Sequence, residues 1–150
     1  MINLKLIYKI IGSLLFIESA LMMVCLAMAF YFREDDILAF GVAVAATSLC
    51  GLFMRFMGRD SDNSLSRRDA YLVVTLTWLV FSLLGTLPFV VSGYLPSFTD
   101  AFFETMSGFT TTGATVINDV EALPHGLLFW RSLMQWIGGL GIVFFTIALL

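Results

Sequence analysis

The sequence predicts an all-α integral membrane protein, in which two leading transmembrane helices precede a unit of helix, half-length helix, loop and helix. Apolar residues make up 59 % of the 150 residues and charged residues only 13 %, whereas a soluble domain has about 45–50 % and about 25 %. The apolar residues gather in runs of about 20 residues, the helical length that crosses a hydrocarbon core. These runs do not alternate polar and apolar residues as barrel strands do, so helices are the expected spanning structure.

The first two predicted spans cover residues 10–32 and 37–57, and a charged turn at 33–36 separates them. Glu18 lies about two turns into the first span, where a lone charge is expensive. We expect its carboxylate to pair with an arginine such as Arg55. Protonation of the carboxyl and a role in an ion relay are the alternatives.

The third predicted span covers residues 70–93, after a polar stretch at 58–69. Basic residues flank the spans at Lys5, Lys9, Arg55, Arg59, Arg67 and Arg68. The positive-inside rule places such regions in the cytoplasm, and the turn at 33–36, with one arginine and three acids, suits the outer side. We therefore expect a cytoplasmic N-terminus and a third span that runs outward.

The segment after the third span predicts a short helix. Ser97 or Thr99 can serve as N-cap, and Ser97 with Asp100 fits a capping box in which Asp replaces the usual Glu or Gln. The helix should end near Ser107 or Gly108, because the glycines and threonines that follow continue a helix poorly. Roughly ten residues extend about 15 Å, which is half of a membrane.

A last apolar segment runs inward from about Pro124 to Leu150 and ends without a cytoplasmic flank. We therefore expect a piece of a longer protein. Two units are predicted: a leading transmembrane helix pair with its cytoplasmic loop, residues 1–69, and a unit of residues 70–150 that is incomplete at its C-terminus. The second unit has the layout of a helix–pore loop–helix repeat.

The residues after the half-length helix, Thr110, Thr111, Thr112 and Gly113, have the chemistry that a potassium pathway needs. Consecutive backbone carbonyls can replace the hydration shell of the ion, and glycine permits the unusual backbone conformations that this requires. The partially negative C-terminus of the short helix also favours a cation. Taken alone, these four residues would equally suit a helix C-cap made by glycine.

Two longer motifs resemble those of one family of membrane proteins. FFETMSGFTTTGAT, residues 102–115, resembles the first pore loop of the Trk/Ktr/HKT potassium transporters, and specifically that of the Trk membrane subunit. FWRSLMQWIGGLGI, residues 129–142, resembles the start of the helix that follows in that family. The two leading spans fit as well, since Trk subunits place a helix pair before their first pore unit. The resemblance covers essentially the whole chain, as an N-terminal portion of such a subunit.

The resemblance implies a potassium-channel-like fold of four joined repeats, of which this chain holds the first. Gly113 would be the filter glycine of its repeat, and Thr111 and Thr112 would offer backbone carbonyls to the transported potassium ion, with Thr110 next in line. The other repeats would come from the rest of the protein or from further copies of the chain in a homo-oligomer. The family also works with a cytosolic nucleotide-binding regulatory subunit.

Two charged residues are expected to support this loop. Glu104, on the half-length helix, can bond filter or neighbouring backbone amides, or raise the local concentration of cations. Arg131 can pair with Glu104 or Asp119, or extend to the outer interface. Asp119 and Glu121 suit either an outer vestibule or an ordinary solvated loop.

An enzyme is not expected, because no nucleophile–base pair is evident and the single histidine and two cysteines lack metal-ligand spacing. A net charge of −3 argues against a nucleic-acid partner and against an anionic-lipid binder. We expect potassium transport by a multi-pass protein of the bacterial inner membrane, surrounded by lipid. The alternative is a non-conducting assembly or regulatory fragment that packs against a complete transporter.

Overall fold

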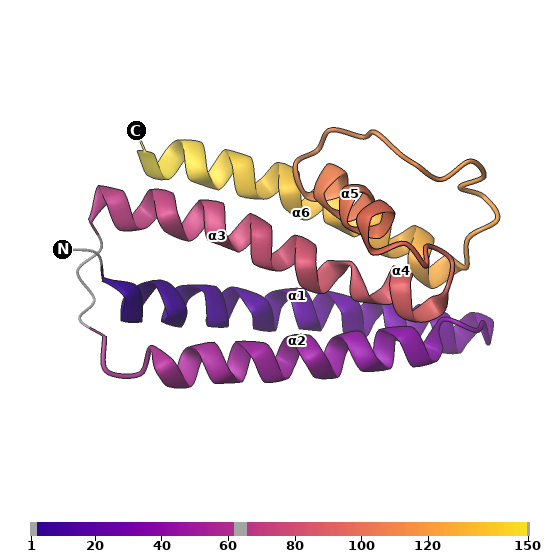
Figure 1. Cartoon of the computed structure of the whole chain (residues 1–150), viewed down its shortest axis with the longest axis horizontal. Coiled ribbons are helices and arrows are strands. Elements are labelled where there is room, and N and C mark those ends of the chain that lie inside the picture. Colours follow the sequence, from indigo (N-terminus) through magenta and orange to yellow (C-terminus); the bar gives the residue numbers. More distant parts are fainter. Residues whose placement is uncertain (1–2, 62–65, 150) are drawn as a thin grey trace.

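The computed structural model describes residues 3–61 and 66–149, with side chains as far as Val143. These residues form the helices α1 (Leu4–Phe32), α2 (Ile37–Met57), α3 (Arg67–Gly85), α4 (Leu87–Ser92), α5 (Phe98–Phe109) and α6 (His125–Leu149). The long helices lie side by side, and the short α5 lies against α6 (Figure 1). Among the described residues, α1, α2 and the α3–α4 segment (Arg67–Ser92) are long and apolar enough to cross a membrane. The predicted all-α membrane class is confirmed.

Helices α1 and α2 form a closely packed hairpin. A side chain on Gly12 of α1 would come within 2.8 Å of the Gly51 carbonyl oxygen of α2, so the two backbones touch directly, as small residues allow in membrane helix pairs. The hydroxyls of Ser19 and Ser48 lie 2.7 Å apart across the same interface. α2 has its predicted bounds, whereas α1 begins six residues before its predicted start, with Asn3 as its N-cap.

The expected pair of Glu18 with Arg55 is absent. The Arg55 guanidinium donates a hydrogen bond to the Ser13 hydroxyl at 2.8 Å. Glu18 is fully buried, and neither of its carboxylate oxygens has a hydrogen-bond partner among the residues that the structure describes. The prediction failed because Ser13 lies more than one turn closer than Glu18 to the basic end of the hairpin. Its hydroxyl, and not the Glu18 carboxylate, is within hydrogen-bond distance of the Arg55 guanidinium.

Helix α3 begins three residues before its predicted start, inside the stretch expected to be a polar loop. Ser66 is its N-cap and forms a capping box with Asp69, in which the serine hydroxyl accepts from the Asp69 N–H at 3.2 Å. The aspartate in turn accepts from the Ser66 N–H at 3.2 Å. These reciprocal bonds satisfy backbone donors of the first turn, which allows Arg67 and Arg68 to start the helix.

The predicted single span 70–93 is interrupted at Thr86, between α3 and α4. Pro88 has no N–H to offer the Leu84 carbonyl and its ring disturbs the preceding turn. The Phe89 N–H bonds the Thr86 carbonyl at 3.1 Å. The Gly85 carbonyl instead accepts from the Trp130 indole N–H of α6 at 3.1 Å. The interruption is therefore linked by a hydrogen bond to the helix that supports the candidate site.

Candidate functional site

The half-length helix α5 presents the candidate site at its C-terminal end. Ser97 is its N-cap and accepts from the Asp100 N–H at 3.4 Å. Twelve residues extend about 18 Å, slightly more than the sequence predicts. The last residue, Phe109, is buried between Phe81 of α3 and Trp130 of α6, with ring centroids 5.6 and 6.1 Å away. The end of α5 is thus fixed by aromatic packing on two sides.

The C-terminus of α5 closes with a Schellman motif whose left-handed residue is Thr111. The Thr112 N–H bonds the Ser107 carbonyl at 2.9 Å and the Thr111 N–H bonds the Gly108 carbonyl at 3.0 Å, the bonding pattern that defines this cap. Thr111 has φ +58°, a conformation that costs a non-glycine residue about 1 kcal/mol or more. The cap therefore uses a threonine where glycine is usual.

Gly113 directly follows Thr112, the last residue of this cap, and is not part of the cap. Its φ is +75°, and a Cβ at this position would meet no atom within 4 Å. The need for glycine here comes from the backbone conformation and not from crowding within the chain. A glycine C-cap, the alternative left open by the sequence, does not account for this residue.

The same hydrogen bonds orient the carbonyl groups of the loop. In a trans peptide the C=O of one residue and the N–H of the next point in opposite directions. Because the N–H groups of Thr111 and Thr112 turn back into α5, the carbonyl oxygens of Thr110 and Thr111 point away from it. Thr111, Thr112 and Gly113 are exposed, so no other segment of the described chain covers this face of the loop.

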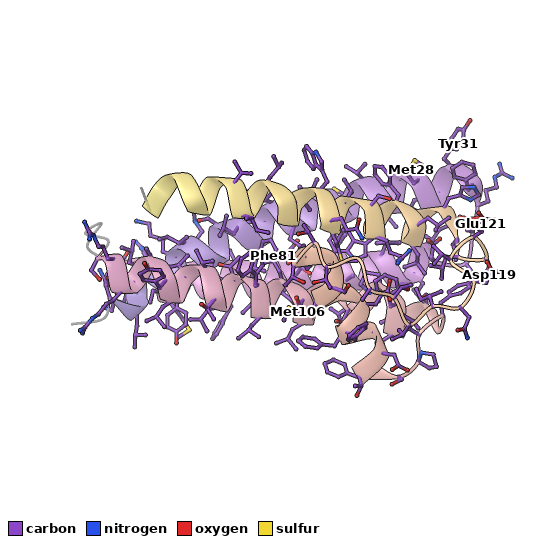
Figure 2. The ribbon with its side chains drawn as sticks, turned by 90° about the horizontal axis from the view of Figure 1, so that it is seen from above. Met28, Tyr31, Phe81, Met106, Asp119 and Glu121 are labelled. Carbon is purple, nitrogen blue, oxygen red and sulfur yellow. The ribbon has the colours of Figure 1, made fainter. Side chains whose placement is uncertain are left out.

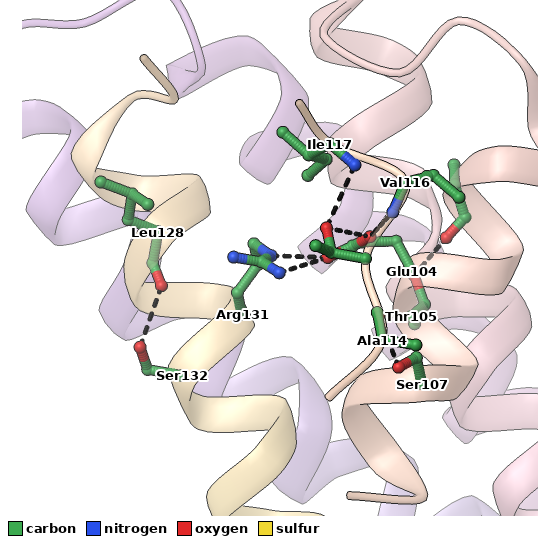
Figure 3. A network of polar contacts seen from close by, with 11 residues as sticks. Glu104, Thr105, Ser107, Ala114, Val116, Ile117, Leu128, Arg131 and Ser132 are labelled. Atoms are coloured by element: carbon green, nitrogen blue, oxygen red, sulfur yellow. Dashed lines mark hydrogen bonds and ion pairs between the residues drawn. The ribbon is translucent and has the colours of Figure 1, made fainter. Parts of the chain in front are cut away.

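Glu104 joins the loop to both neighbouring helices (Figure 3). Its carboxylate accepts from the Thr115 hydroxyl at 2.9 Å and from the Val116 N–H at 3.2 Å. The Arg131 Nε of α6 donates to Glu104 Oε1 at 2.7 Å, and the two side chains form an ion pair. The predicted pairing of Arg131 with Glu104 is present; the role of the two residues beside a filter stays a prediction.

A second set of hydrogen bonds holds the loop closer to the end of α5. The Ser107 hydroxyl donates to the Ala114 carbonyl at 2.7 Å, and the hydroxyls of Thr110 and Thr112 lie 2.8 Å apart. Ser107 and Thr115 are functional candidates that the sequence analysis did not single out. The signal was present, since small hydroxyl residues on both sides of a glycine loop can hydrogen-bond nearby backbone and side chains.

Helix α6 passes closely beneath the candidate site. A side chain on Gly138 would strike the Phe109 carbonyl oxygen, and one on Gly108 would come within 3.1 Å of the Met134 Cβ. Two glycines on different helices therefore let α5 and α6 touch at the point where α5 ends. This close packing applies at Gly138 and not at Gly141, where a Cβ would meet nothing within 4 Å.

The start of α6 is held by the turn between α1 and α2. The Glu34 carboxylate accepts from the His125 N–H at 2.7 Å and lies 2.8 Å from its ring nitrogen, while Phe32 stacks on the same ring. The Asp36 carboxylate is buried against Gly126. This arrangement fixes the position of α6, and with it the position of Arg131.

The acidic pair of the returning segment lies apart from the Glu104 network. Asp119 and Glu121 are exposed and lie at the end of the molecule where α1 carries Tyr31 (Figure 2). Neither is brought to Arg131, which pairs with Glu104. The vestibule role stays a prediction for both residues.

Comparison with known proteins gives a consistent picture. A family model described as TrkH, cation transport protein, matches residues 36–150. The Trk system potassium uptake protein TrkH of Halomonas elongata is 39 % identical over 149 residues, which are 99 % of this chain and 31 % of that protein. The protein of the same name from Escherichia coli K12 is 36 % identical over 145 residues, which are 96 % and 30 % of the two chains.

A solved structure matches as well. The crystal structure of the potassium transporter TrkH from Vibrio parahaemolyticus superposes on this chain with a TM-score of 0.89 at 37 % identity, over 97 % of this chain and 31 % of that one. The chain spans about three tenths of the length of these relatives.

Proposed function

The chain belongs to the TrkH family of cation transport proteins, and on this basis we propose that it supplies the first of four pore-forming repeats of a potassium uptake protein. In this proposal, residues 1–69 are the leading helix pair. Within residues 70–150, α3 and α4 form the first helix of the repeat, α5 the pore helix, and α6 the second helix. Potassium is the transported ion. The names of the relatives do not favour a non-conducting regulatory fragment.

The observation that carries the proposal is the orientation of the loop after α5. The carbonyl oxygens of Thr110 and Thr111 point away from the helix, on an exposed face, because the next N–H groups bond back into it. Carbonyls arranged in this way can replace the hydration shell of a potassium ion. The C-terminal end of α5 adds a partial negative charge beside them.

One such loop gives an ion only part of its coordination. The exposed face of Thr111, Thr112 and Gly113 suits a position beside equivalent loops, which the remaining repeats or further copies of the chain would provide. Passive conduction through the shared constriction would follow, with Glu104 and Arg131 holding this loop in place. A cytosolic nucleotide-binding regulatory subunit would control opening.

The arrangement of the chain ends is consistent with the proposed orientation. The start of α1, the end of α2 and the start of α3 lie at one end of the molecule (Figure 1). This end carries the basic residues Lys5, Lys9, Arg55, Arg59, Arg67 and Arg68. The positive-inside rule would place it in the cytoplasm of a bacterial cell, with the protein in the inner membrane.

Growth at low external potassium tests the proposal. The full-length protein that contains this chain would be expressed in cells stripped of their own potassium uptake systems, and its insertion in the membrane checked by fractionation. We expect growth to be restored at low potassium and not in cells with an empty vector. An inserted protein that restores no growth and no potassium uptake would contradict the transport function.

A further inference from the structure

A basic pocket lies at the end of the α1–α2 hairpin that carries the N-terminus, outside the candidate filter. Its volume is about 330 Å³, and it is lined by Lys9, Leu52, Arg55, Phe56 and Arg59. Three of these five residues are cations and none is acidic. The proposed conduction mechanism uses none of them. The net charge of −3 argued against an anionic-lipid binder, but the charge of this pocket is locally positive.

The backbone brings these residues together from two helices. Leu52, Arg55 and Phe56 are spaced by three and four residues, which places them on one face at the end of α2, and Arg59 follows in the turn after the helix. Gly58 permits the approach of α1, since a Cβ there would lie 2.6 Å from the Lys9 N and 2.8 Å from its Cβ. The Lys9 side chain therefore enters the pocket beside the two arginines.

The central arginine is held in place. Arg55 Nη1 donates to the Ser13 hydroxyl at 2.8 Å, and this hydroxyl donates to the Lys9 carbonyl at 2.9 Å. A guanidinium has five N–H donors in a fixed fork. Since Arg55 lines the pocket, a positioned fork with further donors is available to a phosphate, the geometry that arginine binds best.

The pocket also has an apolar side. Leu52 and Phe56 are 58 % and 72 % exposed, and the outward face of α2 continues with the exposed Leu49 and Phe53. A ligand that fits both sides has a phosphate group and a long hydrocarbon chain. We propose that this pocket binds the headgroup phosphate of an anionic phospholipid, with an acyl chain along the exposed face of α2.

Basic pockets between membrane helices bind anionic headgroups at the cytoplasmic surface, and the proposed orientation places this pocket there. A simpler role for the cations is to complement the negative C-terminal end of α2. That role would not require Lys9 of α1 to lie beside Arg55 and Arg59 of the neighbouring segment. It would also not require the apolar surface next to these cations. A free phosphate ion would use the cations and leave Leu52 and Phe56 uncovered.

Native mass spectrometry of the full-length protein in detergent tests the proposal, with phosphatidylglycerol and phosphatidylcholine as probes. Wild type should retain phosphatidylglycerol in preference to phosphatidylcholine. Removing one cation near the headgroup should weaken retention about fivefold, and removing two about 25-fold.

The test variants are Arg59→Gln and Lys9→Gln/Arg59→Gln, which leave Arg55 and Ser13 unchanged. The matched controls, Arg67→Gln and Arg67→Gln/Arg68→Gln, remove equal charge outside the pocket and should retain the lipid.

The outcomes distinguish a phospholipid site from a diffuse basic surface and from a site for free phosphate. Equal weakening in the test and control variants would overturn the proposal in favour of a diffuse basic surface. Equal retention of the two lipids by wild type would overturn it directly. Displacement of phosphatidylglycerol by millimolar inorganic phosphate would show a phosphate site and not a lipid site. Far-UV circular dichroism shows whether each variant is folded; if the double variant is not, the comparison of Arg59→Gln with Arg67→Gln decides. Potassium uptake plays no part in the readout, so failure here leaves the proposed function untouched.

Discussion

Glu104 connects three segments that the sequence separates by many residues. Its carboxylate receives hydrogen bonds from the loop after α5 and an ion pair from α6. The side chain is 2 % exposed and that of Arg131 is 18 % exposed. Removing one member of such a pair leaves a buried charge uncompensated, which costs more than the pair itself contributes.

We therefore expect Arg131→Met to destabilise the protein by about 3 kcal/mol, because the Glu104 carboxylate loses its counter-ion. The double variant Glu104→Gln/Arg131→Met should lose less than the sum of its single variants, since the glutamine oxygen can still accept from Thr115 and Val116. Thermal unfolding of the full-length protein in detergent measures these changes.

The control for this cycle is Ser132→Ala. Ser132 is exposed on the same helix and bonds only the Leu128 carbonyl one turn earlier among the contacts of Figure 3. A change within about 0.5 kcal/mol is expected there. If the double variant Glu104→Gln/Arg131→Met loses as much stability as the two single variants together, Glu104 and Arg131 are not energetically coupled.

At the scale of elements, the crossing of α5 and α6 is the closest helix contact near the loop. Gly138→Ala should destabilise the protein by about 1–3 kcal/mol, because the new methyl group would strike the Phe109 carbonyl oxygen. Gly141→Ala is the matched control in the same helix. Its Cβ meets nothing within 4 Å, and alanine is the better helix former by about 1 kcal/mol. Equal loss in both variants would refute the close crossing.

The turn between α1 and α2 contains a buried acid, Asp36, whose effect depends on pH. Burial raises the pKa of its carboxyl, and the negative charges of Glu34 and Asp35 add to this. A carboxyl with a raised pKa in the folded state binds a proton on folding. The stability that it contributes is therefore full below its ordinary pKa and lost as pH rises through the raised value.

Asp36→Asn should therefore raise the unfolding temperature more at pH 8 than at about pH 4, because burial raises the pKa of the aspartate carboxyl and the amide has no proton to lose as pH rises. Asp35→Asn, one residue earlier and exposed, should raise the unfolding temperature at pH 8 by much less, because the Asp35 charge contributes least to the raised pKa of Asp36. Thermal unfolding of both variants across this range measures the difference. A lower unfolding temperature for Asp36→Asn at pH 8 would show that the charged carboxylate stabilises the start of α6.

Most elements were predictable, because long apolar runs and their charged ends mark spans clearly. α2 has its predicted bounds, and α5 begins at the predicted cap Ser97. The interruption of the helix just before Pro88 was missed, although the proline was visible, because hydropathy alone does not respond to a missing N–H. The partner of Glu18 was also wrong, since the choice among nearby polar groups depends on side-chain geometry that no sequence pattern encodes.

At the scale of the whole molecule, the helix pair α1–α2 supports the unit that carries the candidate filter. Glu34 and Asp36 of its turn lie against the start of α6, and α2 packs against α4. The sequence indicated the residues of the loop but not how they are held, because the left-handed cap at Thr111 and the bonds to Glu104 depend on three-dimensional contacts. The resulting loop is fixed on its inner side and open on the other.

The most direct test of the filter proposal compares two glycines of similar positive φ in the full-length protein. Gly113 and Gly93 have φ of +75° and +80°, and a Cβ at either position meets nothing within 4 Å. Serine at either site costs similar conformational energy, but only Gly113 lies in the proposed filter. The measurement is uptake of potassium and of sodium by cells that express each variant at equal membrane levels. The account predicts that Gly113→Ser loses uptake or discrimination between the two ions by tenfold or more, while Gly93→Ser transports as the wild type does. Equal transport by the two variants would contradict the assignment of this loop as the potassium filter.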